Sequence, residues 1–263
     1  MLKTNRSKFE IENMHNFTKE QVEIKRAENR QASQSWLSLN TMPEKMYFIF
    51  NKYIERKAKV QDKIVFIDIG AAEGCFSHCV AKNFENFNIL AFEPESERLD
   101  IFEENLSFIT KESKGSPMIE INQALVTDGS KDVETLRHYI CNFTNGGAGS
   151  SRMYKADRPD RKWHDLKFDC VKMDDYTDKF DKVDAVKIDV EGAEVMVLNG
   201  AKKFIEKYKP VIFLEIHSHP DNGGVTLEDV KEAVASYSVD YEFRLIEHHL
   251  PPMLSYYLLK PKG

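Results

Sequence analysis

The chain of 263 residues lacks several features that would assign it to a functional class at once. It has no excess of basic residues, since 37 lysines and arginines stand against 43 aspartates and glutamates, for a net charge of −6. This balance argues against a general nucleic-acid binder, although it leaves room for a local basic patch. No apolar run is long enough to cross a bilayer, and the polar N-terminus has no apolar signal-peptide core. We therefore expect a cytoplasmic protein without a membrane span.

Cysteine is scarce, with four residues at positions 75, 79, 141 and 170. They form no C-x-x-C pair and have no histidines at the spacing of a zinc site. Reduced thiols in the core of a cytosolic protein are the simplest interpretation.

Glycine is absent from the first 59 residues, and this part of the chain has a helical composition. Residues 18–36 are rich in Lys, Glu, Gln and Ala, and Pro43 could begin a second helix over residues 44–57. We expect a helical N-terminal extension at 1–60, followed by one domain at 61–263. The extension could cover the active site, join copies into a homo-oligomer, or simply pack on the sheet, and its residues do not choose among these roles.

Beyond residue 60 the pattern alternates between short apolar runs and helical periodicity. Strands are expected at 63–68, 88–93 and 119–126, with helices at 76–84 and 95–108. An irregular stretch at 128–174 includes possible strands at 133–140 and 168–173 and a glycine-rich loop at 145–151. The alternation resumes with strands at 183–189, 210–216, 241–247 and 255–259 and helices at 193–208 and 226–236, the last with Thr226 as N-cap. This order predicts a doubly wound α/β domain.

Polar residues collect where these strands end. They are Asp68-Ile-Gly-Ala-Ala-Glu-Gly74, Phe92-Glu93-Pro94, Asn122-Gln123-Ala124, Lys187-Ile-Asp189-Val-Glu191 and Glu215-Ile-His217. Ligands of doubly wound sheets bind beyond the carboxyl ends of the strands. The sequence therefore predicts a binding pocket at this edge of the sheet.

The first two of these segments indicate a nucleoside ligand. Gly70 and Gly74 let the chain turn sharply and bring backbone N–H groups close to a ligand. Glu93 follows Asp68 by 25 residues and can accept both ribose hydroxyls. This arrangement suits either a dinucleotide or S-adenosylmethionine.

Two residues favour S-adenosylmethionine. Ala72 stands where the dinucleotide fingerprint has its second glycine, and Glu73 would repel a pyrophosphate. An acidic loop instead suits a ligand with a sulfonium and an ammonium group. A nicotinamide-dependent oxidoreductase remains the alternative enzyme, and a non-catalytic glycan-binding protein of the same fold is a third hypothesis.

These segments resemble the FkbM family of S-adenosylmethionine-dependent methyltransferases. The most specific part is Val186-Lys-Ile-Asp-Val-Glu-Gly-Ala-Glu194, followed by Leu198-Asn-Gly200. The resemblance extends over about residues 64–215. It implies a class I methyltransferase fold, which is a Rossmann-like, mostly parallel sheet with an antiparallel last strand. It also implies O-methylation of a sugar, glycan or natural-product hydroxyl.

The resemblance assigns roles residue by residue. Asp68, Gly70 and Gly74 match the first methyltransferase motif, Glu93 matches the ribose-binding acid, and Gln123 and Ala124 match the segment along the adenine. The full set of residues expected to bind the cofactor is Asp68, Gly70, Ala71, Glu73, Gly74, Glu93, Pro94, Gln123 and Ala124. Lys187, Asp189 and Glu191 match the signature that faces the methyl group and the substrate. The chain departs from the family at Ala72 and Glu73, where an Asn and then an apolar residue are usual.

Methyl transfer to a hydroxyl needs a base, for which the candidates are Asp189, Glu191, His217 and Lys187. His217 has the most suitable ordinary pKa, Asp189 has the stronger motif support, and Lys187 could lower the pKa of the hydroxyl. The acids and His217 could cluster around a metal, but an oxygen-rich set does not demand one, so no metal is expected. Glu194 is interpreted as an acid that favours the start of a helix.

Overall fold

The computed structural model describes residues 1–10, 18–19, 22–23, 26–27, 30–31, 45–112, 115–139, 151–152, 163–218, 224–249 and 254–262. Cys141, most of the helix expected at 18–36 and the glycine-rich loop up to residue 150 lie outside these ranges.

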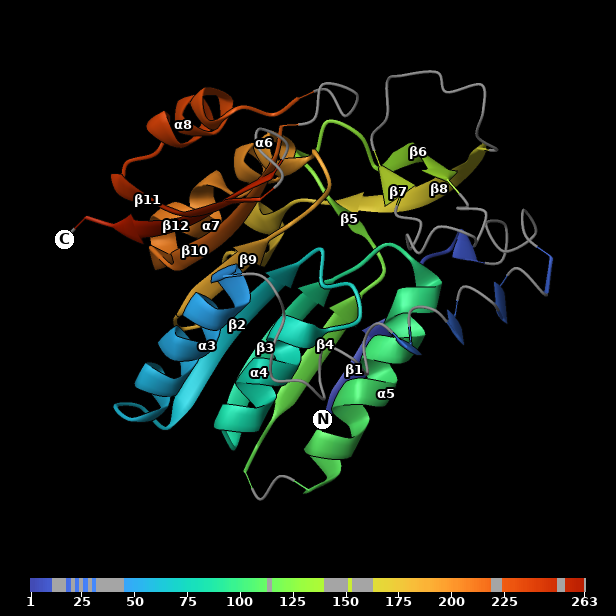
Figure 1. Ribbon diagram of the computed structural model, residues 1–263, viewed down its shortest axis with the longest axis horizontal. Helices are drawn as coiled ribbons and strands as arrows, with labels where there is room; N and C mark the ends of the chain where they lie inside the picture. Colours follow the sequence, from blue (N-terminus) through green and yellow to red (C-terminus); the bar gives the residue numbers. More distant parts are fainter. Residues whose placement is uncertain are drawn as a thin grey trace.

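An eight-stranded sheet forms the centre of the molecule (Figure 1). Its order is β1 (Leu2–Asn5), β4 (Met118–Asn122), β3 (Asn86–Phe92), β2 (Lys63–Ile69), β9 (Ala185–Ile188), β10 (Val211–His217), β12 (Leu254–Pro261) and β11 (Tyr241–His249). All neighbours are parallel except β12, which is antiparallel to both of its neighbours. The mostly parallel sheet with an antiparallel last strand is thus confirmed. The chain reverses its direction of winding between β2 and β9, and such a switch point opens a crevice for ligands.

Helices cover both faces of this sheet (Figure 1). The helices α3 (Lys45–Ala58), α4 (Cys75–Asn83) and α5 (Ser96–Glu112) pack on one face, and α6 (Glu194–Asn199), α7 (Lys202–Tyr208) and α8 (Leu227–Ala235) on the other. In β2, Ile64 and Phe66 join the first of these cores, whereas Val65 and Ile67 join the second. This alternation follows from the two-residue period of a strand. In the described part of the chain, no helix has the length and apolarity to span a membrane.

A second, small sheet lies beyond the carboxyl end of β4 (Figure 1). Its order is β5 (Leu125–Val126), β8 (Trp163–Val171), β6 (Val133–Tyr139) and β7 (Ser151–Arg152). The expectation of one strand over 119–126 is therefore wrong. The backbone N–H of Ala124 bonds the carbonyl of Asn122, and this turn sends β5 out of the main sheet to pair with β8.

The helix expected at 193–208 is also interrupted. The carbonyl of Gly200 accepts the N–H of Asp174, and the N–H of Phe204 donates to the Asp174 side chain at 3.0 Å. Asp174, from the short helix η2 (Met173–Tyr176), thus takes both partners of the hydrogen bond that would continue the helix. The chain therefore forms α6 and α7 in place of one helix.

The N-terminal part is helical only in part. The helix expected at 44–57 is confirmed as α3. The first residues, however, form β1, which adds a parallel strand beside β4 at the edge of the main sheet. The expected cap of α8 is confirmed, because the Thr226 hydroxyl accepts the N–H of Asp229 and the Asp229 carboxylate accepts the N–H of Thr226.

Candidate functional site

A cavity opens at the carboxyl ends of β2, β3 and β9 and against the small sheet. Its lining consists of residues 69–70, 72, 92–95, 98, 124–127, 134, 136, 189–191, 193 and 196. The residues expected from the sequence that reach this lining are Gly70, Glu93, Pro94, Ala124, Asp189 and Glu191. Absent from this lining are the remaining expected residues, Asp68, Ala71, Glu73, Gly74, Gln123, Lys187 and His217.

The loop between β2 and α4 forms one wall. The N–H groups of Gly70 and Ala71 both donate to the carbonyl of Phe92 at 2.9 Å, which binds the loop to the end of β3. Gly70 and Gly74 have φ of 73° and 80°, a region that glycine enters without strain. Asp68 is fully buried behind the loop and accepts the Ser77 hydroxyl at 2.6 Å. Asp68 and Gly74 therefore shape the loop from outside the cavity lining.

Glu93 stands directly beyond β3 and is 5% exposed. One carboxylate oxygen accepts the N–H of Ala72 and the other the N–H of Glu95, both at 2.9 Å. Burial raises the pKa of Glu93 to about 7, with Arg98 opposing the shift and Glu95 adding to it. Glu93 thus connects the glycine loop to the start of α5 and presents its carboxylate at the cavity wall.

Arg98 changes the interpretation of Glu73. The guanidinium of Arg98 lies 3.2 Å from the Glu73 carboxylate and 3.3 Å from that of Glu95. Burial would lower the pKa of Arg98, but Glu73, Glu95 and Glu93 together raise it. Glu73 is 2% exposed and is absent from the cavity lining. Its charge is therefore paired with Arg98, and we correct the inference that it faces a cationic ligand.

The N-terminal strand supports the cavity from behind. The N–H of Gln123 donates to the Asn5 carbonyl at 2.9 Å, and the Gln123 side chain accepts the N–H of Ser7 at 3.0 Å. The same side chain donates to the carbonyl of Pro94 at 3.2 Å. Gln123 therefore joins the N-terminal segment to the loop that carries Glu93, and it does not line the cavity itself.

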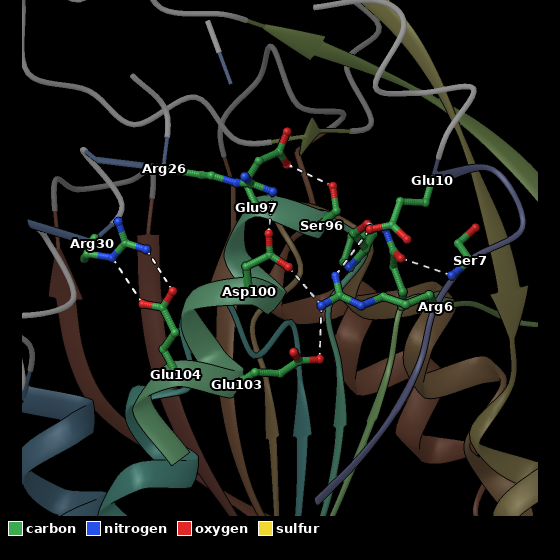
Figure 2. Close-up of polar contacts among 12 residues, drawn as sticks. Arg6, Ser7, Glu10, Arg26, Arg30, Ser96, Glu97, Asp100, Glu103 and Glu104 are labelled. Atoms are coloured by element: carbon green, nitrogen blue, oxygen red, sulfur yellow. Dashed lines mark hydrogen bonds and ion pairs between the residues drawn. The ribbon is translucent and has the colours of Figure 1, made fainter. Parts of the chain in front are cut away.

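Ion pairs attach the N-terminal segment to α5 (Figure 2). Arg6 lies 2.9 Å from Asp100 and 3.0 Å from Glu103, Arg26 lies 2.6 Å from Asp100, and Arg30 lies 2.8 Å from Glu104. All three acids belong to α5, whose N-terminus follows Glu93 and Glu95.

Lys187 and Asp189 come from β9 and the loop after it. The Lys187 side chain is 2% exposed, and its ammonium donates to the Gly70 carbonyl at 2.5 Å and lies 3.2 Å from Asp189. Burial would lower the pKa of Lys187, but Asp189 and Asp68 raise it. Burial would likewise raise the pKa of Asp189, but Lys187 and His217 hold it below its ordinary value. Asp189 is therefore an ionised carboxylate on the cavity wall, oriented by a buried cation.

His217 ends β10 and meets four carboxylates. Its Nδ1 lies 2.6 Å from Glu194, and its Nε2 lies 3.6 Å from Glu191 and from Glu215 and 3.9 Å from Asp189. Burial would lower the pKa of His217, but Glu194 and the other acids raise it to about 10. The imidazole is then protonated at neutral pH, so the expectation that His217 has a pKa suited to a base needs correction.

Sequence reasoning missed Arg98 and undervalued Glu194. Glu194 does open α6, as expected, but it is also fully buried, and its carboxylate accepts the N–H of Gly192 and bonds the His217 ring. For Arg98, the available signal was its place in the first turn of the helix after Glu93. For Glu194, the available signal was its place as the last acid of the family signature.

The comparisons with known proteins agree with this geometry. A family model described as a methyltransferase FkbM domain matches residues 68–245. A crystal structure of methyltransferase FkbM from Methylobacillus flagellatus KT is similar, with a TM-score of 0.51 and 19% identity over 75% of this chain. This chain spans 44% of the length of that structure.

A crystal structure of an rRNA methylase from Streptococcus thermophilus has 10% identity and a TM-score of 0.48, and it matches 85% of this chain and 100% of its own. A comparison with curated proteins finds no significant match. The family model covers more than half of the chain and includes every strand-end segment of the cavity. The chain therefore belongs to the FkbM methyltransferase family.

Proposed function

We propose that this protein transfers a methyl group from S-adenosylmethionine to a hydroxyl group of its acceptor. The observation that carries the proposal is the place of Glu93, on the cavity wall beside the backbone of Gly70 and Ala72 at the switch point of the sheet. A carboxylate at this place can accept hydrogen bonds from the two ribose hydroxyls of a nucleoside.

The rest of the cavity fits such a cofactor. Phe92, Leu125 and Leu136 offer apolar surface to an adenine ring, whereas Asp189 and Glu191 offer negative charge to a cationic group. When bound, the cofactor supplies an activated methyl group on a positively charged sulfur.

The protein's part in the reaction is to align the acceptor oxygen and remove its proton. An oxygen–carbon bond forms, the carbon–sulfur bond breaks, and the hydroxyl proton passes to a carboxylate. Lys187 and His217 are protonated in this environment and cannot accept it. Asp189 and Glu191 remain, both on the cavity wall. We assign the proton to Asp189, which Lys187 holds in place, and Lys187 is then a positioning residue.

Family membership supports a sugar, a glycan or a natural product as the source of the hydroxyl. The net charge of −6 and the acids of the cavity wall disfavour a polyanionic nucleic acid as the acceptor. Cytoplasmic residence and self-association through the N-terminal segment stay predictions.

Binding of radiolabelled S-adenosylmethionine tests the proposal directly. Wild-type protein should bind it, Glu93→Ala should abolish binding, and Glu104→Ala, which changes an exposed acid on the same α5, should bind as wild type does. Binding that survives Glu93→Ala unchanged would refute the assignment of Glu93. A thermal shift with a nicotinamide dinucleotide and none with S-adenosylmethionine would support the oxidoreductase alternative instead.

The base is tested separately by Asp189→Asn. This variant should fold and bind the cofactor but turn over a hydroxyl acceptor at least about 100-fold more slowly, as expected for the loss of a general base. Wild-type turnover in Asp189→Asn would move the role to Glu191.

A further inference from the structure

We propose that Asp189, Glu215 and His217 hold a divalent transition-metal cation at the edge of the cavity. One ligand atom of each residue lies within 4.8 Å of one atom of each of the others. Glu215 and His217 are buried, and Asp189 is half-buried on the cavity wall. The metal site stands on this geometry alone, and only the catalytic role given to the cation below rests on the proposed function.

The distances around His217 fit a shared cation better than direct hydrogen bonds. Its Nε2 lies 3.6 Å from Glu215 and 3.9 Å from Asp189, longer than the roughly 2.7–3.2 Å of a hydrogen bond. Zinc-like cations sit about 2.0–2.2 Å from imidazole and carboxylate ligands, which places neighbouring ligand atoms roughly 3.0–3.6 Å apart. A small contraction of the cluster around a cation would reach that spacing.

Glu194 is not one of the three proposed ligands, and it supplies a further observation. It lies 2.6 Å from Nδ1 of His217, whose side chain is 4% exposed. Metal-bound histidines commonly donate their second ring N–H to a carboxylate, which fixes the tautomer and turns the other nitrogen toward the metal. Nε2 faces Asp189 and Glu215, and a cation bound between them would take the place of the Nε2 proton.

The surrounding charge also favours a divalent cation, which carries one positive charge more than the ring proton that it would displace. In the described part of the chain, four carboxylates surround His217, namely Asp189, Glu191, Glu194 and Glu215. Lys187 contributes one ammonium, which lies on the Oδ2 side of Asp189, whereas Oδ1 faces His217. Asp189 can therefore serve the lysine with one oxygen and a cation with the other.

The donor set indicates the class of cation. An imidazole nitrogen with two carboxylates suits Mn²⁺ or Zn²⁺ better than Mg²⁺ or Ca²⁺, which prefer oxygen alone. A cation here would lower the pKa of an acceptor hydroxyl bound beside Asp189.

The site is tested by Mn²⁺ binding to the full chain after a chelator has removed its metals. Binding is followed by the electron paramagnetic resonance signal of the Mn²⁺ that stays free. We expect one Mn²⁺ per chain, displaced by Zn²⁺ and not by equal Mg²⁺. Glu215→Gln and His217→Ala should abolish binding, and Glu194→Gln should weaken it 10–100-fold. Glu134→Gln, which changes another acid of the cavity lining, should bind as wild type does.

Failure to bind Mn²⁺ by folded wild-type protein would overturn the proposal, and so would equal loss of binding in Glu134→Gln. If Glu215→Gln does not fold, as judged by circular dichroism, Mn²⁺ binding by wild-type protein and by Glu194→Gln still tests the proposal. S-adenosylmethionine binding is measured on the same metal-free protein. If the protein binds Mn²⁺ but not S-adenosylmethionine, the proposed function is refuted and the metal site stands. If it binds S-adenosylmethionine but not Mn²⁺, the metal site is refuted and the proposed function stands.

Discussion

Replacing Gly70 by alanine should destabilise the protein far more than the same change at Gly129. Both glycines lie in the left-handed region, with φ of +73° and +77°, so alanine meets the same backbone cost of about 1–2 kcal/mol at each. At Gly129 the new Cβ would lie 3.0 Å from the flexible side chain of Lys172, which can move. At Gly70 it would lie 1.8 Å from the backbone oxygen of Asp189.

The size of the stability loss at Gly70 follows from the steric overlap there and from the hydrogen bonds that break when the two strand ends move apart. A distance of 1.8 Å is shorter by about 1.5 Å than a normal carbon–oxygen contact of roughly 3.3 Å, so the ends of β2 and β9 must move apart. That movement breaks the hydrogen bond from the Asp189 N–H to Ile69 and the one from Lys187 to the Gly70 carbonyl. A neutral and a charged hydrogen bond contribute about 1 and 2 kcal/mol. With the backbone cost, Gly70→Ala should lose about 4–5 kcal/mol and Gly129→Ala about 1–2 kcal/mol.

Urea-induced unfolding, followed by circular dichroism at several wavelengths, measures both variants against wild type. The slopes of the unfolding free energy against urea should agree if only stability has changed. Gly70→Ala should also weaken S-adenosylmethionine binding, because the loop that it displaces lines the cavity. Equal losses of stability in the two variants would refute the steric reasoning.

Four further predictions use other parts of the structure. Because burial raises the pKa of Glu93 to about 7, S-adenosylmethionine affinity should fall below pH 7, by up to tenfold per unit, and titration calorimetry across pH should detect it. The same raised pKa means that Glu93 lowers the stability of the ligand-free protein as pH rises from 4.5 to 7, since the unfolded chain loses the proton first. Thr226→Ala removes the cap of α8 and should cost about 1 kcal/mol in urea unfolding, and no loss would contradict the assigned cap. Arg6→Ala should cost about 0.5–1 kcal/mol at low salt and less at high salt, and a loss independent of salt would show that its pairs with Asp100 and Glu103 do not carry the effect.

The sequence predicted those cavity residues whose position depends only on where a strand ends. Glu93 and Asp189 follow apolar runs of parallel strands, and parallel strands bring their carboxyl ends to one edge regardless of how the helices pack. His217 was found in the same way, although its charge state was not. Its pKa depends on Glu194 and the acids around it, and their distances are set only by the folded chain.

The sequence could not predict contacts that helix packing creates. Arg98 neutralises Glu73 because α5 packs beside the β2–α4 loop, and the residue spacing alone does not set that distance. The strand β1 was missed for another reason. It is four residues long, mostly polar, and joins the sheet through backbone hydrogen bonds, which leave no hydrophobic pattern to recognise.

Lys187 shows how two motifs distant in sequence form one wall. The sequence marked it as an anomaly, since a buried lysine needs a partner. The register of β2 against β9 places Lys187 opposite Asp68, and its ammonium reaches the Gly70 carbonyl and Asp189. Without it, two acids would be left in a buried site, at a cost of about 3–5 kcal/mol typical of a broken buried pair. The glycine loop and the family signature therefore depend on the same cation, and neither can be displaced without the other.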